Sequence, residues 1–137
     1  MNTLAIKYQP QNGTKELNTY FHKDTFWMTL ENMSHLFNSD AMKIYTAFKE
    51  VIKEDAFDIL DSNEQIEIMS ENGREIIGNF YNLDVIMAIG YRLNPKEATE
   101  FRLWSLFVVK IYIRQQAKME YGVVGSLKKS FSRLLSA

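Results

Sequence analysis

Between positions 39 and 53 the sequence places hydroxyl and basic side chains three or four residues apart, which is the spacing of one helix face. Such side chains bind DNA when they share a surface. Lysines neutralise phosphates, and short polar groups near the start of a helix reach base edges. The candidate DNA-contacting residues are Ser39, Lys43, Thr46, Lys49 and Lys53.

Three interpretations of this polar face remain open on the residues alone: a DNA contact, a protein-binding face, or a solvated surface without a partner. Asp40, Glu50 and Glu54 stand among the bases, and carboxylates at these places repel phosphate. The whole chain carries a net charge of −1, so no global charge attracts nucleic acid.

Charge is distributed unevenly along the chain. Positions 50 to 75 hold nine acids against two bases, whereas positions 110 to 137 hold six bases against one acid. Two solvated faces of opposite sign explain this pattern, and so does a partner surface at one end or head-to-tail self-association. An acidic surface would attract a basic protein, and the candidate residues for it are Glu64, Glu67, Glu71 and Glu75.

No residue set in the sequence predicts catalysis or a cofactor. The chain has no cysteine, which excludes disulfides and thiol chemistry. His22 and His35 have no acid or cysteine at ligand spacing, so no metal site is expected. The segment "SENGRE" lacks the lysine-serine ending of a phosphate loop, and no Ser/His/Asp set is suggested by spacing. We therefore expect a non-catalytic protein without a cofactor.

The polar face needs a pair of helices to present it, and the sequence supplies them after a small amino-terminal hairpin. The segments "LAIKYQ", "ELNTYFH" and "FWM" are strand-like, with turn signals between them. Apolar residues from Leu30 to Phe37 then repeat at three and four, and Thr29 is placed to cap that helix. Ser39 is expected to cap the next helix, with Asp40 in its first turn.

A second hairpin follows these helices, in the position of a wing. The alternation in "EQIEIM", the Asn72-Gly73 turn signal and the return "EIIGNFY" predict it, with a bulge at Gly78. Asn82 then caps a nearly all-apolar helix, in which Gly90 would allow close packing.

The clearest helix start in the chain is "NPKE". Asn94 is its cap, Pro95 takes the first helical position, and Glu97 can close a capping box. A long helix is expected from there to about Met119, and "SLKKSFSRLL" is expected to form a basic amphipathic tail helix.

These elements predict an α+β fold: a winged helix-turn-helix-like core with β-hairpins, then two buried helices and a short carboxy-terminal tail helix. A chain of 137 residues is expected to form a single domain. Its winged helix-turn-helix-like part is residues 26–81, its helical part 82–119 and its amphipathic tail 123–137. Trp27 and Trp104 are expected in the core.

Three blocks of the sequence, "FWMTLENMSHLF", "NFYNLDVIMAIGYRL" and "FRLWSLFVVKIYI", resemble the RhuM-like family of bacterial virulence- and mobile-element-associated proteins. That family is loosely related to phage antirepressor DNA-binding domains. The likeness covers residues 26 to 113, and the combination of "YNLD", "GYR" and "FRxW" is its most specific part. It implies DNA binding. Arg92 and Arg102 of these blocks are expected to pair with acids such as Asp84 or to cap helix ends.

The expected function is therefore a small non-catalytic DNA-binding or regulatory protein of a bacterial or phage mobile element. The alternative is a phage- or element-encoded inhibitor, for example of a nucleic-acid-binding host defence complex, that uses the acidic surface on a retained DNA-binding scaffold. Neither a signal peptide nor a membrane span is visible, which favours the cytoplasm.

Self-association is also expected, because the long helix is apolar on more than one side and such a helix must be covered all round. We expect a homodimer through this helix and the tail. Its tail contacts would be Leu127, Phe131, Leu134 and Leu135.

Overall fold

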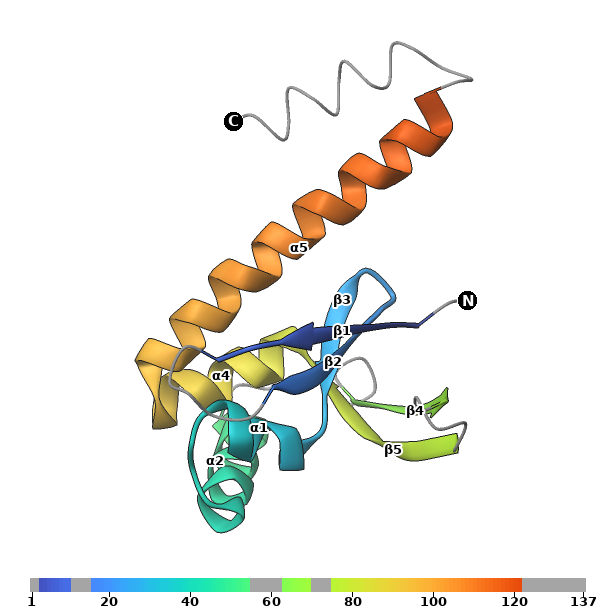
Figure 1. Ribbon diagram of the computed structural model, residues 1–137. Coiled ribbons are helices and arrows are strands. Elements are labelled where there is room, and N and C mark those ends of the chain that lie inside the picture. The colour runs from blue at the N-terminus through green and yellow to red at the C-terminus, as the bar shows by residue number, and fades with distance from the viewer. Residues whose placement is uncertain (1–2, 11–15, 55–62, 70–74, 122–137) are drawn as a thin grey trace. The chain divides into compact units, whose positions relative to one another are not determined.

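The computed structural model describes residues 3–10, 16–54, 63–69 and 75–121. Of residues 63–69, 75–77 and 119–121 it describes the backbone. Internal contacts divide the chain into two units, Met1–Glu100 and Phe101–Ala137. The described part is α+β, as predicted (Figure 1).

Within the described residues of the first unit, five antiparallel strands form one sheet in the order β1-β2-β3-β5-β4 (Figure 1). Both predicted hairpins are confirmed, and pairing of β3 with β5 joins them into this sheet. The strands are β1 (Leu4–Tyr8), β2 (Leu17–His22), β3 (Thr25–Met28), β4 (Asn63–Met69) and β5 (Glu75–Asn82).

The turn predicted between β2 and β3 is present, whereas the bulge predicted at Gly78 is not. Lys23 and Asp24, between β2 and β3, have φ values of 51° and 63°. Positive φ at both central residues is the geometry of a two-residue hairpin turn that follows the twist of the strands. The bulge expected at Gly78 is wrong, because the β4–β5 register runs without interruption and Gly78 pairs directly with Ile66.

Three helices of the first unit hold one another on the sheet. Helix α1 (Leu30–Leu36) contacts β2, and α4 (Leu83–Leu93) contacts β3 and β5. Helix α2 (Ala41–Glu54) packs against both α1 and α4. The position of α2 is therefore set by two helices that themselves rest on the sheet.

Side-chain caps fix where these helices begin. Thr29 Oγ1 accepts the backbone N–H of Asn32 at 3.1 Å, and Asn82 Oδ1 accepts that of Val85 at 3.2 Å, so both predicted caps are confirmed. The prediction for α2 is wrong by one residue. Asp40 Oδ1, not the Ser39 hydroxyl, accepts the backbone N–H of Lys43, at 2.8 Å.

The reason for the shift at α2 lies in the backbone before it. The Ser39 backbone N–H donates to the carbonyl of Ser34 at 3.0 Å, which closes the end of α1. Helix α2 then starts at Ala41, so Asp40 stands at the cap. A carboxylate makes a charge-assisted hydrogen bond there, which is stronger than one from a hydroxyl.

Gly90 of α4 packs closely against Phe37, the residue that follows α1. A Cβ atom at Gly90 would lie 2.5 Å from Phe37 Cζ and 2.9 Å from Ala98 Cβ, so only glycine fits without a shift. This confirms the predicted close approach. Asn94 ties the same region together, since its Nδ2 donates to the Phe37 carbonyl at 3.1 Å. Trp27 is buried as expected, and its Nε1 donates to the His22 carbonyl at 2.6 Å.

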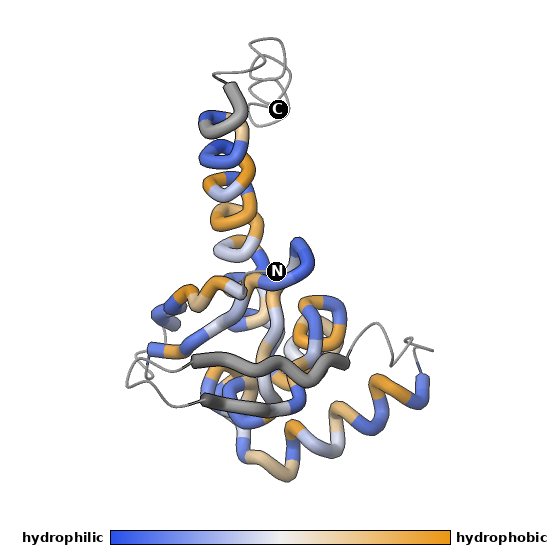
Figure 2. The backbone as a smooth tube through the Cα atoms, turned by 90° about the vertical axis from the view of Figure 1, so that its right-hand side faces the viewer, coloured by the Kyte–Doolittle hydropathy of each residue, from blue (hydrophilic) through white to orange (hydrophobic). Residues whose placement is uncertain are grey.

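The second unit is described from Phe101 to Tyr121, where helix α5 (Pro95–Tyr121) ends within two residues of its predicted end. Phe101 is buried, but Trp104 is partly exposed, so the prediction that Trp104 lies in the core is wrong. Their ring centroids lie 5.6 Å apart. Figure 2 shows apolar and polar residues mixed along this helix, because its sequence has no single apolar face.

Candidate functional site

Helix α2 buries one face and exposes the other. Ile44, Ala47 and Val51 form the buried face. Two residues that the helical pattern assigns to the packed arc, Ala41 and Tyr45, are exposed. Tyr45 lies at one end of that arc and Ala41 is about 40° from it, whereas Val51 at the other end is buried. The exposed face is therefore wider than the sequence predicts.

The structure places four of the five predicted DNA-contacting residues, Lys43, Thr46, Lys49 and Lys53, on the exposed face of α2. At ~100° per residue they share about a third of the helix circumference. Ser39 is half-buried and precedes the helix. The predicted set is thus brought together, apart from Ser39, and its role in DNA binding stays a prediction.

Two apolar side chains on the same helix were not predicted as part of this face. Met42 is 73% exposed and Tyr45 is 47% exposed. The Lys49 ammonium lies 4.6 Å from the centroid of the Tyr45 ring, which is cation–π geometry. The ring therefore orients one of the candidate phosphate contacts. In the sequence, the one sign that Tyr45 belongs to the exposed face is its position at the edge of the apolar arc of α2.

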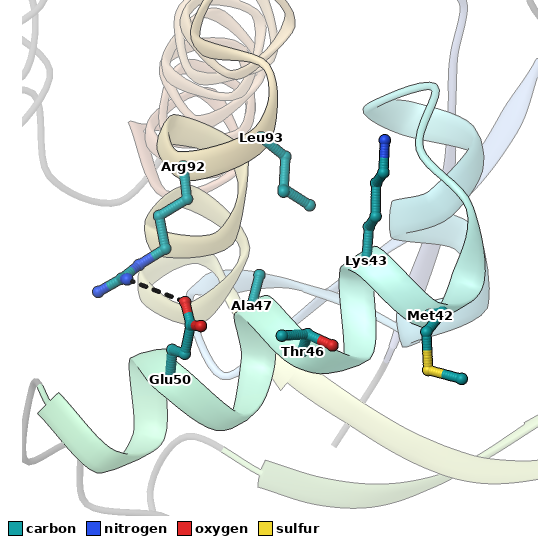
Figure 3. A pocket seen from close by; sticks show the side chains of 7 residues that line it. All are labelled: Met42, Lys43, Thr46, Ala47, Glu50, Arg92 and Leu93. Carbon is teal, nitrogen blue, oxygen red and sulfur yellow. Dashed lines mark ion pairs between the residues drawn. The ribbon is translucent and has the colours of Figure 1, made fainter.

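Arg92 of α4 pairs with two acids of α2. Its Nη2 lies 2.6 Å from Glu54 Oε2. Its Nη1 lies 3.6 Å from Glu50 Oε2 (Figure 3). The expected pairing of Arg92 with an acid is confirmed, although the partner is not Asp84. These two glutamates are among the acids expected to repel phosphate, so the pairing changes the charge of the α2 face.

A hollow of about 310 Å³ lies between α2 and the end of α4. Figure 3 shows the Arg92–Glu50 pair at one end of it and Lys43 with Met42 toward the other. The hollow is therefore lined by both charged and apolar side chains. Its lining residues are Met42, Lys43, Thr46, Ala47, Glu50, Arg92 and Leu93.

A second hollow, of about 360 Å³, lies at the turn between α1 and α2. Its lining is mostly polar and includes the half-buried Ser39 together with the capping Asp40. The residues that line it are Ser34, His35, Asn38, Ser39, Asp40 and Ala41.

The residues of the other two predicted surfaces are not placed. Glu71 lies outside the described residues, and the side chains of Glu64, Glu67 and Glu75 are also outside the description, although their strands are formed. The predicted dimer contacts Leu127, Phe131, Leu134 and Leu135 lie outside the described residues as well. Both surfaces stay predictions.

Tyr8 of β1 is a buried ionisable group in the sheet. Burial, together with the charges of Glu97 and Glu100, raises the pKa of Tyr8 to about 12. A phenol with this pKa stays protonated at neutral pH, so Tyr8 is not a general base there. Its role is in packing.

The described residues contain no membrane span and no cluster of metal ligands. None of their helices is long and apolar enough to cross a membrane. In the same part of the chain, no group of three His, Asp or Glu side chains is placed to hold a metal ion.

Residues 59–133 match the model of the Virulence protein RhuM family, which is more than half of the 137-residue chain. The matched region includes the "YNLD", "GYR" and "FRxW" blocks. It begins after α2, so the candidate DNA-contacting residues precede it. No curated protein and no solved structure gives a significant match to the chain.

Proposed function

The chain belongs to the Virulence protein RhuM family, and we propose from this premise that it is a small, non-catalytic DNA-binding regulator of a bacterial or phage mobile element. In this proposal the region from α1 to β5 acts as a winged helix-turn-helix. Helix α2 is the recognition helix, and the β4–β5 hairpin takes the position of the wing.

The order and packing of the elements support this proposal. Two helices joined by a short turn are followed by an antiparallel hairpin, and α2 is held from behind by α1 and α4. A recognition helix needs such support, because it must enter the major groove as a rigid body with one face free. Lys43, Lys49 and Lys53 lie on the free face of α2.

The observation that carries the proposal is the pairing of Arg92 with Glu50 and Glu54. Without Arg92, these two carboxylates would stand among the three lysines and offset their attraction for phosphate. With it, a base from α4 compensates acids of α2. The exposed side of α2 then presents a positive surface, although the whole chain has a net charge of −1.

The polar and apolar groups between the lysines suit base contacts. Thr46 is exposed in the middle of the lysine face, and its hydroxyl can donate to or accept from a base edge. Among the described residues Met42 is the most exposed large apolar side chain, and it lies in the first turn of α2. A side chain of this kind at the start of a recognition helix fits against a thymine methyl group.

Fluorescence anisotropy with a labelled random-sequence duplex tests the proposal over a range of salt concentrations. Affinity should fall steeply with salt, because each neutralised phosphate releases counterions. The combined variant Lys43→Ala, Lys49→Ala and Lys53→Ala should bind more weakly, with its salt slope reduced by up to roughly 3. Its thermal melting curve should match that of the parent, because all three side chains are exposed.

The matched control removes three bases elsewhere. Lys7, Lys96 and Arg102 are exposed and lie outside α2, so replacing all three with alanine gives the same net charge. This control should keep the parental salt slope. An equal loss in the two triple variants would show that only the total charge matters, and would contradict a recognition role for α2.

A chain that binds no duplex at low salt would overturn the DNA proposal. The alternative proposal would then stand: an inhibitor that uses the acids of the segment from position 50 to 75 to bind a basic, nucleic-acid-binding host protein. Glu64, Glu67, Glu71 and Glu75 would be its contacts, and their replacement with glutamine should weaken that binding.

A further inference from the structure

Helix α5 leaves four large apolar side chains exposed within nine residues of the second unit. A soluble chain that presents such a row to water loses the free energy that burial would supply. The exposed fractions are 56% for Leu103, 49% for Leu106, 61% for Phe107 and 39% for Ile111.

The row is symmetric about Phe107. Leu103 precedes Phe107 by four residues and Ile111 follows it by four, so all three lie on one side of the helix. Seven residues before Phe107 is Glu100, and seven residues after it is Arg114. An acid, an aliphatic residue, a central ring, an aliphatic residue and a base therefore follow one another along one stripe.

We propose that this stripe, defined by Leu103, Phe107 and Ile111, binds the same stripe of a second copy of the chain in antiparallel orientation. A two-fold axis at Phe107 brings Phe107 against its equivalent in the second copy. It places Leu103 opposite Ile111 of the second copy, and Glu100 opposite Arg114. Each apolar residue then meets an apolar residue, and each charge meets its opposite.

Charge selects the antiparallel orientation over the parallel one. In a parallel pair Arg114 would stand beside Arg114 of the second copy, and Glu100 beside Glu100, which is repulsive at both ends. Antiparallel helix dipoles also attract.

This pairing gives the expected dimer an orientation and limits its contacts on the long helix to one stripe. It does not rest on the proposed DNA binding, because α2 contributes nothing to the stripe. The experiments can therefore distinguish a dimer that does not bind DNA from a single copy that does.

Cysteine cross-linking tests the orientation, and the chain is suited to it because it contains no cysteine. A mixture of Leu103→Cys and Ile111→Cys chains should form a disulfide between the two variants under mild oxidation. Leu103→Cys alone should not cross-link, because its two copies would be about 12 Å apart along the helix axis. A disulfide requires Cα atoms within about 7 Å.

Light scattering after size exclusion tests the stripe itself. The parent chain should have the mass of two copies, and Phe107→Glu should have the mass of one. The matched control is Gln116→Glu, which adds the same carboxylate at an exposed position on the opposite side of α5. Arg114→Glu should also weaken the dimer, whereas Arg102→Glu, another exposed position away from the stripe, should not.

Three results would each overturn the proposal. The first is the mass of one copy for the parent chain at all micromolar concentrations. The second is a dimer that forms only after residues 122–137 are deleted, since the tail of the same chain would then be the partner of the stripe. The third is efficient cross-linking of Leu103→Cys with itself, which requires parallel helices.

Discussion

Helices α2 and α5 differ in which kind of side chain they leave exposed. The buried residues of α2 are small or branched apolar ones, and its exposed face carries lysines, Thr46 and two acids paired with Arg92. From Phe101 onward, α5 exposes Leu103, Phe107 and Ile111 instead. One helix has its apolar face covered within its own unit, while the other presents apolar surface to solvent.

The difference indicates two kinds of partner. A covered helix with a charged free face gains most from a charged partner, and such binding weakens with salt. A helix with exposed leucine, phenylalanine and isoleucine gains most from an apolar partner, and such binding depends on concentration and hardly on salt. The same small protein therefore separates a proposed recognition surface from a proposed assembly surface.

Replacing one phenylalanine in each of the two units gives the largest expected effect. Phe37→Ala should lower the free energy of unfolding by about 3–5 kcal/mol, because the ring is fully buried and its removal leaves a cavity. Phe107→Ala should have an effect within about 0.5 kcal/mol in dilute solution, because the ring is exposed in a single copy. Chemical denaturation followed by circular dichroism measures both.

Protein concentration separates the two phenylalanines further. The loss caused by Phe37→Ala should be the same at every concentration, whereas the effect of Phe107→Ala should grow as the protein is concentrated. An equal and concentration-independent loss in both variants would contradict the difference between the two helices. It would mean that Phe107 is buried within a single chain.

A smaller effect is expected from a single methyl group at Gly90. Gly90→Ala should destabilise the first unit by about 1–3 kcal/mol, because the new Cβ would lie 2.5 Å from the ring of Phe37, which caps the end of α1. The same change at Gly78 is the matched control. A Cβ atom at Gly78 would lie 3.5 Å from Phe80, which is an ordinary contact. The melting temperature of Gly78→Ala should therefore stay near that of the parent.

If Gly90→Ala melts as the parent does, the ring moves aside freely and α2 is not held by tight packing. That result would remove the physical basis for a rigid recognition helix, since the support of α2 depends on α1 and α4.

Much of the first unit was predictable from local signals. The caps Thr29 and Asn82 act within three residues of themselves, so their sequence context contains both donor and acceptor. The cap of α2 was not predictable to the residue, because Ser39 and Asp40 are adjacent and both are good caps. Only the backbone path out of α1 decides between them.

The candidate site depended more on contacts between distant residues. Arg92 and Glu54 are separated by 38 positions, so no helical or strand period connects them. Their motif context showed that Arg92 needs an acid, but the fold selects which one. Along α5 the limit is different: apolar residues occur around the helix, and composition does not tell which side a neighbour covers.

The smallest expected effect concerns Arg92 and tests the charged face of α2. Arg92→Gln should weaken duplex binding by at most about 1 kcal/mol at low salt, the usual size of one exposed charge interaction, since Glu50 and Glu54 would lose their base. The same change in a chain that already carries Glu50→Gln and Glu54→Gln should have little further effect, because no carboxylate remains to be released. This double-mutant comparison separates compensation of the acids from a direct phosphate contact by Arg92, which would give the same loss in both backgrounds.

The dimer mass should be unchanged in all of these variants, because the apolar stripe of α5 contains none of the three residues. A simultaneous loss of the dimer would show that the two surfaces are coupled, and would contradict the separation of charged and apolar partners between α2 and α5.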